Sequence, residues 1–196
     1  MNSKVDIGEK EKNSAKDWFE ELRNHICDAF EKIEISQESG PFSHLKPGKF
    51  ERKTTSRENN GNQDGGGGVM SVMRNGRVFE KVGVNISTVY GELETPAQKS
   101  LSSRHDIPGL KDDPRFWASG ISLVAHMQSP KTPAVHMNTR MFWTPGITWF
   151  GGGADLNPMV ENSKDTQFFH ECLKKACDKT DQEYYPKFKS WADEYF

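Results

Sequence analysis

The spacing of apolar residues predicts a helix at the start of the chain. From Ala15 to Ile33, apolar side chains recur at three- and four-residue steps, and charged residues lie off this stripe. This pattern is typical of a helix with one buried face. Gly40 and Pro41 end any continuation of the helix. Residues 1–14 are mostly polar and of mixed charge, so we expect them to form a flexible tail.

The next distinctive stretch has no apolar side chain at all. Residues 51–68 are polar or glycine, and Gly65–Gly68 are four consecutive glycines. Such a segment cannot bury side chains in a core, so we expect a mobile loop over residues 53–68. A glycine run can also offer backbone amides to an anion, although flexibility is its commoner role.

After residue 68 the pattern changes to short runs rich in β-branched residues. Asn75-Gly76 between two such runs is a strong hairpin signal, and Gly83 separates the second run from a third. Residues 92–114 contain three prolines and are expected to form a loop. The expected strands are Val69–Met73, Arg77–Val82, Val84–Tyr90, Gly120–Met127, Ala134–Trp143 and Thr148–Phe150.

Two helices are expected to follow the strands. The first, of about 14 residues, is capped by Ser163 or Asp165, and the second starts near Asp181. A helix, then antiparallel strands, then helices predicts an α+β fold with one large, meandering antiparallel sheet flanked on both faces by helices. A chain of 196 residues is expected to form a single domain.

Composition excludes several classes of function. With 28 acidic and 26 basic residues the net charge is -2, so nucleic-acid binding is not expected. No apolar run approaches the ~18 residues of a membrane span, and the first residues do not look like a signal or transit peptide. The three cysteines form no CxxC motif, so neither a disulfide framework nor a zinc site is expected. These features favour a cytoplasmic protein.

Candidate chemistry is concentrated in one strand-like run. His136, Asn138 and Arg140 alternate with Val135, Met137, Thr139 and Met141. Because side chains alternate across a strand, the three polar residues share one face. An imidazole, an amide and a guanidinium on one face can hold a carboxylate and move a proton. From the pattern alone, the solvent-exposed face of an edge strand is an equally good interpretation.

The preceding run adds polar residues to the same face. Ser122 and His126 also lie at alternating positions. If residues 130–133 close a hairpin evenly, His126 lies opposite His136 and Ser122 lies opposite Arg140. Two opposed histidines can bind a metal, share a proton or lie idle at a surface.

A second glycine-rich stretch follows the last expected strand. Gly151–Gly153 are expected to form a turn at which the backbone approaches a ligand closely, with Asp155 at its mouth. The plainer interpretation is a glycine-rich bend with a turn-favouring aspartate. The spacing is not GxGxxG, so nucleotide binding is not expected. His170 lies on an expected helix, where a lone histidine usually has a structural role.

Four segments together resemble the oxygen-dependent coproporphyrinogen-III oxidase family. They follow one another in the family's order and with similar spacing over most of residues 65–196, whereas the polar stretch 53–64 is not expected from the resemblance. The segments are GGGGVMSVMRNGRVFEKVGVNISTVYGE (65–92), FWASGISLVAHMQSPKTPAVHMNTRMFW (116–143), WFGGGADLNP (149–158) and DQEYYPKFKSWADEYF (181–196).

The resemblance implies a reaction of haem biosynthesis. In it, two propionates of coproporphyrinogen III are oxidatively decarboxylated to vinyl groups, which gives protoporphyrinogen IX and CO2 with O2 as the acceptor. The resemblance also implies a homodimer that needs no organic cofactor, and, for bacterial members, a divalent metal held by histidines.

The resemblance assigns roles to individual residues. It implies that His136 is the general acid, that Ser122 and the segment Asn138-Thr139-Arg140 contact the substrate, and that the metal histidines are His126, His136 and His170. Our own reasoning adds Asp155, which can accept hydrogen bonds from pyrrole N–H groups. Two other functions remain open: a catalytically inactive porphyrin-binding protein, and a metal-dependent hydrolase that uses the histidines.

The last expected helix runs through aromatic residues to the final position. Trp191, Tyr195 and Phe196 continue its pattern, and no Gly, Asn or Pro ends it. We therefore expect the chain to be C-terminally incomplete relative to the family, to lack catalytic residues beyond Phe196, and to be inactive and poorly soluble on its own.

Overall fold

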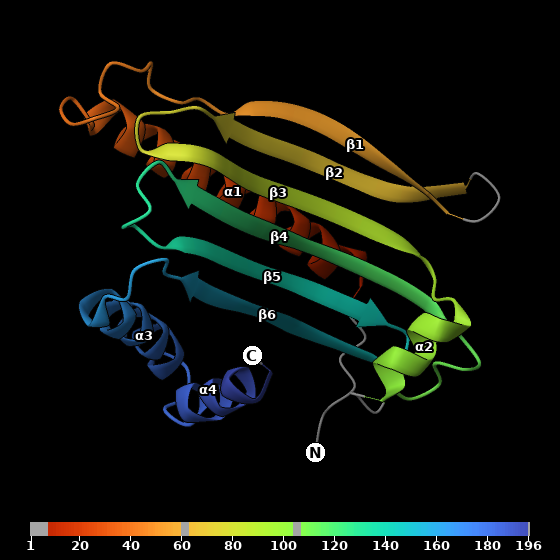
Figure 1. The fold of residues 1–196 in the computed structure, drawn as a ribbon. Helices are drawn as coiled ribbons and strands as arrows, with labels where there is room; N and C mark the ends of the chain where they lie inside the picture. Colours follow the sequence, from red (N-terminus) through yellow and green to blue (C-terminus); the bar gives the residue numbers. More distant parts are fainter. Residues whose placement is uncertain (1–7, 60–62, 104–106, 196) are drawn as a thin grey trace. The chain divides into compact units, whose positions relative to one another are not determined.

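The computed structural model describes residues 8–59, 63–103 and 107–195 (Figure 1). The chain divides into two compact units, Met1–Ser129 with Ala134–Asp155, and Pro130–Pro133 with Leu156–Phe196. The elements in these ranges are α1 (Glu9–Ser36), β1 (Glu51–Asn59), β2 (Gln63–Arg74), β3 (Phe79–Glu92), α2 (Thr95–Ser102), β4 (Arg115–Met127), β5 (Ala134–Thr144), β6 (Ile147–Asn157), α3 (Ser163–Asp178) and α4 (Tyr184–Tyr195).

The strands form one six-stranded sheet in the order of the sequence. The first four strand pairs are antiparallel, which confirms the expected α+β fold and its meandering sheet. The hairpin at Asn75-Gly76 is also confirmed, because both backbone N–H groups donate across the turn to carbonyls of β3. Asn75 takes a positive φ of 54°, which asparagine tolerates. The expected break at Gly83 is wrong, since β3 runs through it without interruption.

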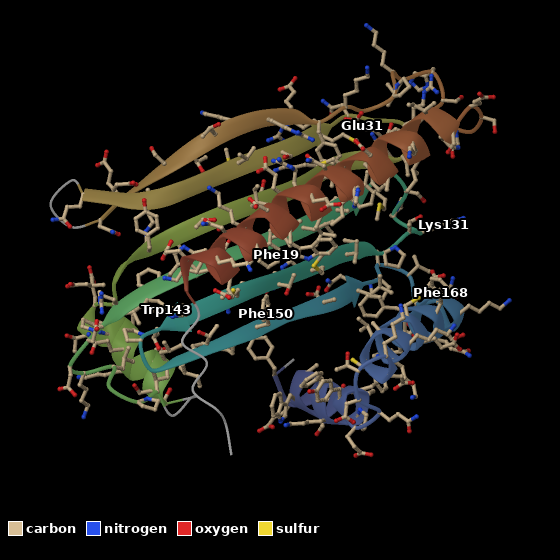
Figure 2. The ribbon with its side chains drawn as sticks, turned by 180° about the vertical axis from the view of Figure 1, so that it is seen from behind. Phe19, Glu31, Lys131, Trp143, Phe150 and Phe168 are labelled. Atoms are coloured by element: carbon tan, nitrogen blue, oxygen red, sulfur yellow. The ribbon has the colours of Figure 1, made fainter. Side chains whose placement is uncertain are left out.

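Helix α1 packs along one face of this sheet (Figure 1). It begins at Glu9, so the expected flexible tail is wrong for residues 9–14, and residues 1–7 lie outside the described residues. Phe19 and Cys27 of α1 are almost fully buried against the sheet. Figure 2 views the sheet from the side on which α1 lies. The sheet residues buried in the same core include Met73, Val82, Val84, Ile121, Leu123, Ala125 and Met141.

The expected mobile loop over residues 53–68 is wrong for every residue of it that the structure describes. Residues 53–59 belong to β1 and residues 63–68 to β2, and the two strands pair with each other. The glycines let neighbouring strands approach closely. A Cβ atom on Gly67 would lie 2.1 Å from the Thr55 carbonyl oxygen, and one on Gly68 would lie 2.1 Å from that of Ile86. Residues 60–62 lie outside the described residues.

Three further features of the elements differ from expectation. Residues 92–114 contain α2, which starts beside a proline because the fixed φ of proline suits the first helical turn. Strand β6 continues through Gly151–Gly153, so the expected glycine turn is wrong. Helix α3 starts at Ser163, and the expected cap by Ser163 or Asp165 is wrong, because the side chain of Asn162 caps the helix by accepting from the Lys164 backbone N–H.

The second compact unit contains α3 and α4. A hydrogen bond of 3.0 Å between the Tyr185 hydroxyl and His170 Nδ1 links the two helices. Neither helix has a fully buried residue among those described. None of the described helices combines the length and the apolar character needed to cross a membrane.

Candidate active site on the open face of the sheet

The face of the sheet away from α1 carries the candidate site. Val84, Leu123 and Met137 lie side by side on neighbouring strands and pack on the α1 side. Because side chains alternate, the neighbours of these residues point to the other side. Asn85, Ser122 and Asn138 are directly adjacent there, on β3, β4 and β5.

The register between β4 and β5 differs from the expected one. His136 lies opposite Val124 rather than His126, and Arg140 lies opposite Gly120 rather than Ser122. The pair nearest the connection is Ala125 with Val135, and the connection itself contains two prolines, Pro130 and Pro133. Each residue of β5 lies opposite a residue of β4 that is two positions from the expected partner. Because side chains alternate with a period of two, every side chain stays on its expected face.

Two side-chain contacts fix how β6 lies beside β5. His136 Nδ1 is 2.8 Å from Asp155 Oδ2, and the Phe142 and Trp149 rings stack with their centres 4.7 Å apart. Both contacts fit one antiparallel register, which places His136, Phe142 and their partners on the face away from α1. We call this face the open face. It comprises the odd-numbered residues 51–57 of β1, 81–91 of β3 and 149–155 of β6, and the even-numbered residues 66–74 of β2, 116–126 of β4 and 136–142 of β5.

Glycine occupies many positions of the open face. Val124 and Met70, which lie on it, are 38% and 39% exposed. Where a strand carries glycine, a flat ligand can approach the backbone directly. The glycines of the open face are Gly66, Gly68, Gly83, Gly91, Gly120, Gly151 and Gly153.

Positive charge also collects on the open face, although the whole chain has a net charge of -2. Arg140 is exposed and, within the described residues, forms no ion pair. Glu51 and Asp155 are the carboxylates at open-face positions of the described strands. The cations there are Lys53, Arg57, Arg74, Lys81 and Arg140.

His136 and Asp155 form a partly buried pair, with side chains 35% and 23% exposed. An ionised carboxylate only accepts hydrogen bonds, so it holds the proton of His136 on Nδ1 and leaves Nε2 for another partner. The expectation that Asp155 lies at the mouth of a turn is wrong, because Asp155 lies on β6. An imidazole oriented in this way can exchange a proton with a bound molecule at Nε2.

The remaining predicted site residues belong to different elements. Thr139 lies on the α1 side of the sheet, opposite Ile121. His126 is exposed on the open face beside Lys81 of β3. His170 belongs to the second compact unit and bonds to Tyr185. Across the described residues, no three His, Cys, Asp or Glu side chains form a group that could hold a metal ion. The three-histidine site stays a prediction, because His126 and His136 belong to the first compact unit and His170 to the second.

Comparison with known proteins adds independent findings. The family profile described as "Coproporphyrinogen III oxidase" matches residues 14–196. The chain is 50% identical over 190 residues to the oxygen-dependent coproporphyrinogen-III oxidase of Rickettsia bellii (strain RML369-C), which covers 97% of this chain and 63% of the relative.

Two further relatives carry the same name. The protein of Rickettsia peacockii (strain Rustic) is 50% identical over 98% of this chain and 63% of the relative. That of Rickettsia akari (strain Hartford) is 51% identical over 94% of this chain and 61% of the relative. The chain thus spans less than two thirds of the length of these curated relatives.

Proposed function

The chain belongs to the coproporphyrinogen III oxidase family, and from this premise we propose that its open face binds coproporphyrinogen III and positions two propionates for oxidative decarboxylation. The substrate carries carboxylates around a ring of pyrroles. It therefore needs a broad surface with cations, hydrogen-bonding groups and little side-chain bulk. The observation that carries the proposal is the row of His136, Asn138 and Arg140 on a glycine-lined, positively charged face.

The proposed reaction balances for each propionate as a two-electron oxidation. The carboxylate leaves as CO2, the adjacent CH2–CH2 unit loses one hydrogen and becomes a vinyl group, and O2 with one additional proton becomes hydrogen peroxide. Two such steps convert coproporphyrinogen III into protoporphyrinogen IX. Oxygen is the acceptor, and the proposal includes no organic cofactor.

Five open-face residues have roles in this proposal. Arg140 pairs with a substrate carboxylate through two parallel N–H donors, and Asn138 and Ser122 add hydrogen bonds beside it. His136, oriented through Nδ1 by Asp155, exchanges a proton at Nε2 as the general acid. Asp155 also stabilises the charged imidazole, and we retain its contact with pyrrole N–H groups as part of the proposal. The cytoplasmic location and the homodimer remain predictions.

The test uses a chimera, because the relatives are longer than this chain. Residues 1–196 replace the matching part of the Rickettsia bellii protein, which supplies the remaining third. Incubated with coproporphyrinogen III in air, the chimera is expected to consume O2 and release CO2 in equal amounts. Tight binding without O2 uptake would instead indicate a porphyrin-binding protein, and hydrolytic activity that depends on added metal would indicate a hydrolase.

Two variants of the chimera test the proton-transfer role. His136→Ala is expected to lower kcat by about 100-fold or more while changing substrate affinity little, because a general acid acts in the transition state. Asp155→Asn is expected to lower kcat by a smaller factor, since the imidazole remains but loses its orientation and charge stabilisation. Unchanged turnover by His136→Ala would remove His136 from the mechanism.

A further inference from the structure

Arg57 belongs to β1 and lies in the polar stretch, residues 53–68, for which the sequence predicted a loop. The β1–β2 register shifts between Ser56 and Glu58, so the ladder alone does not place Arg57. Its contact with Phe116, an open-face residue of β4, puts it on the open face with Thr55 and Lys53. Its guanidinium Cζ lies 5.6 Å from the centre of the Phe116 ring, on β4. The side chain therefore extends across β2 and β3.

The glycines explain why this reach is possible. Gly66 and Gly91 lie on β2 and β3 next to this part of β1 and carry no side chain, and the Asn59 side chain lies over Gly91, where a Cβ atom would be 2.5 Å from its nitrogen. The guanidinium lies over an aromatic ring, a contact that does not use its N–H donors as hydrogen bonds to an oxygen would. Within the described residues, Arg57 forms no ion pair with a carboxylate.

A row of aromatic rings leads from Arg57 toward Arg140. The Phe116 ring is stacked 5.9 Å from that of Phe142, which lies two residues from Arg140 on the same face of β5. Among the described residues, Arg57 and Arg140 are two of the open-face arginines without an ion-pair partner, and a row of aromatic rings lies between them. A rigid ligand with several carboxylates can engage both at once.

We propose that Arg57 forms a second carboxylate-binding subsite, which holds a different propionate of the substrate from the one bound by Arg140. This inference rests on the proposed function, because it assumes that the open face takes a polycarboxylate tetrapyrrole. Arg57 is a binding residue that determines specificity. It favours a ring with carboxylates around its whole edge over a ring with carboxylates on one side only.

The test measures binding of two stable, fluorescent porphyrins to the chimera described above, in which the Rickettsia bellii protein supplies the rest of its length. Coproporphyrin III has four carboxylates, and mesoporphyrin IX has two that lie on one side. Arg57→Gln is expected to weaken coproporphyrin III binding about tenfold and mesoporphyrin IX binding less than threefold. Arg57→Lys keeps the charge but not the two-pronged geometry, and is expected to lose about threefold for coproporphyrin III.

The control is Arg52→Gln, an arginine of the same strand that lies on the α1 side opposite Ser71. It is expected to leave both affinities within twofold. A double variant, Arg57→Gln with Arg140→Gln, is expected to show additive losses, since the two arginines hold separate carboxylates. Circular dichroism and the thermal midpoint establish that each variant is folded.

The outcomes separate the two proposals. If coproporphyrin III binds and Arg140→Gln weakens it but Arg57→Gln does not, the subsite is wrong and the proposed function stands. Equal losses for both porphyrins in Arg57→Gln would show that Arg57 acts only through packing on Phe116, which also overturns the subsite. If the chimera without further substitutions binds neither porphyrin, the proposed function and the subsite both fail.

Discussion

A single buried carboxylate organises one end of the first compact unit. Glu34, near the end of α1, has no exposed surface, and it accepts hydrogen bonds from the backbone N–H groups of Gly48, Arg77, Val78 and Phe79. Burial by itself raises the pKa of Glu34, but the four N–H donors together outweigh burial and hold the pKa below its ordinary value. The residue joins α1 to the turn before β3.

Replacing this carboxylate tests its role. Glu34→Gln is expected to lower the free energy of unfolding by about 2–4 kcal/mol, because a neutral amide accepts fewer bonds and points N–H donors at other donors. Denaturant unfolding followed by circular dichroism measures the loss. The matched control is Glu31→Gln on the same helix, where one carboxylate oxygen accepts only from the Phe50 N–H, and about 1 kcal/mol is expected. Equal losses in the two variants would contradict a special role for Glu34.

The same residue predicts how stability depends on acid. Because the pKa of Glu34 is lower in the folded than in the unfolded chain, its contribution is complete above its unfolded value and disappears as the pH falls through the folded value. The difference in stability between wild type and Glu34→Gln is therefore expected to shrink below about pH 4. Unfolding curves across this range measure it, and a constant difference would show that ionisation of Glu34 is irrelevant.

Sequence reasoning succeeded for some residues and failed for others for a physical reason. His136, Asn138 and Arg140 could be assigned to one face because alternation along a strand is a local property. The pairing of His136 with Asp155 could not be assigned, since it depends on the register of a neighbouring strand. Glu34 gave no signal, because its partners at Arg77–Phe79 are far along the chain.

At the scale of the element, the glycine-rich part of β2 shows how composition can mislead. Its glycines have no side chains to bury, so a search for alternating apolar residues predicts no strand there. Pairing with β1 and β3 nevertheless gives its backbone N–H and C=O groups their hydrogen-bond partners. The same error placed the end of β6 at Phe150, because the three glycines after it resemble a turn. Strands β4 and β5 were predictable, since the alternation of their apolar and polar residues reflects burial on one side.

Alanine substitutions distinguish structural glycines from those that leave room for a ligand. Gly67→Ala is expected to destabilise the fold by about 2 kcal/mol or more, because its Cβ would press on the Thr55 carbonyl. Gly153→Ala should leave the thermal midpoint within a few degrees of wild type, since nothing lies within 4 Å of the added methyl group. That methyl group would occupy the open face, so coproporphyrin III affinity should fall several-fold, as measured by fluorescence titration. Unimpaired binding by Gly153→Ala would contradict the placement of the ligand beside β6.

At the scale of the whole molecule, the distribution of charge matters more than its sum. A net charge of -2 gives no reason to expect an anionic ligand. Among the described residues, the open face nevertheless carries more cations than carboxylates. Its two carboxylates are Glu51 and Asp155, and Asp155 is paired with His136. Its cations are Lys53, Arg57, Arg74, Lys81 and Arg140. The acidic residues are concentrated elsewhere, and several of them lie along α1. A face with its own sign of charge attracts ligands of the opposite sign whatever the total charge is.

This asymmetry predicts that binding depends strongly on salt. The affinity of the chain for coproporphyrin III is expected to fall about tenfold between roughly 0.05 and 0.5 M salt, because added ions screen attraction between exposed charges beyond a few ångströms. Fluorescence titration at a series of salt concentrations measures the slope. Arg57→Gln and Arg140→Gln should each reduce the slope, since each removes a cation from the open face, whereas Arg52→Gln on the α1 side should change it less. A slope that is the same in all three variants would place the ligand away from the open face, and an affinity independent of salt would show that apolar stacking, rather than charge, holds the ring.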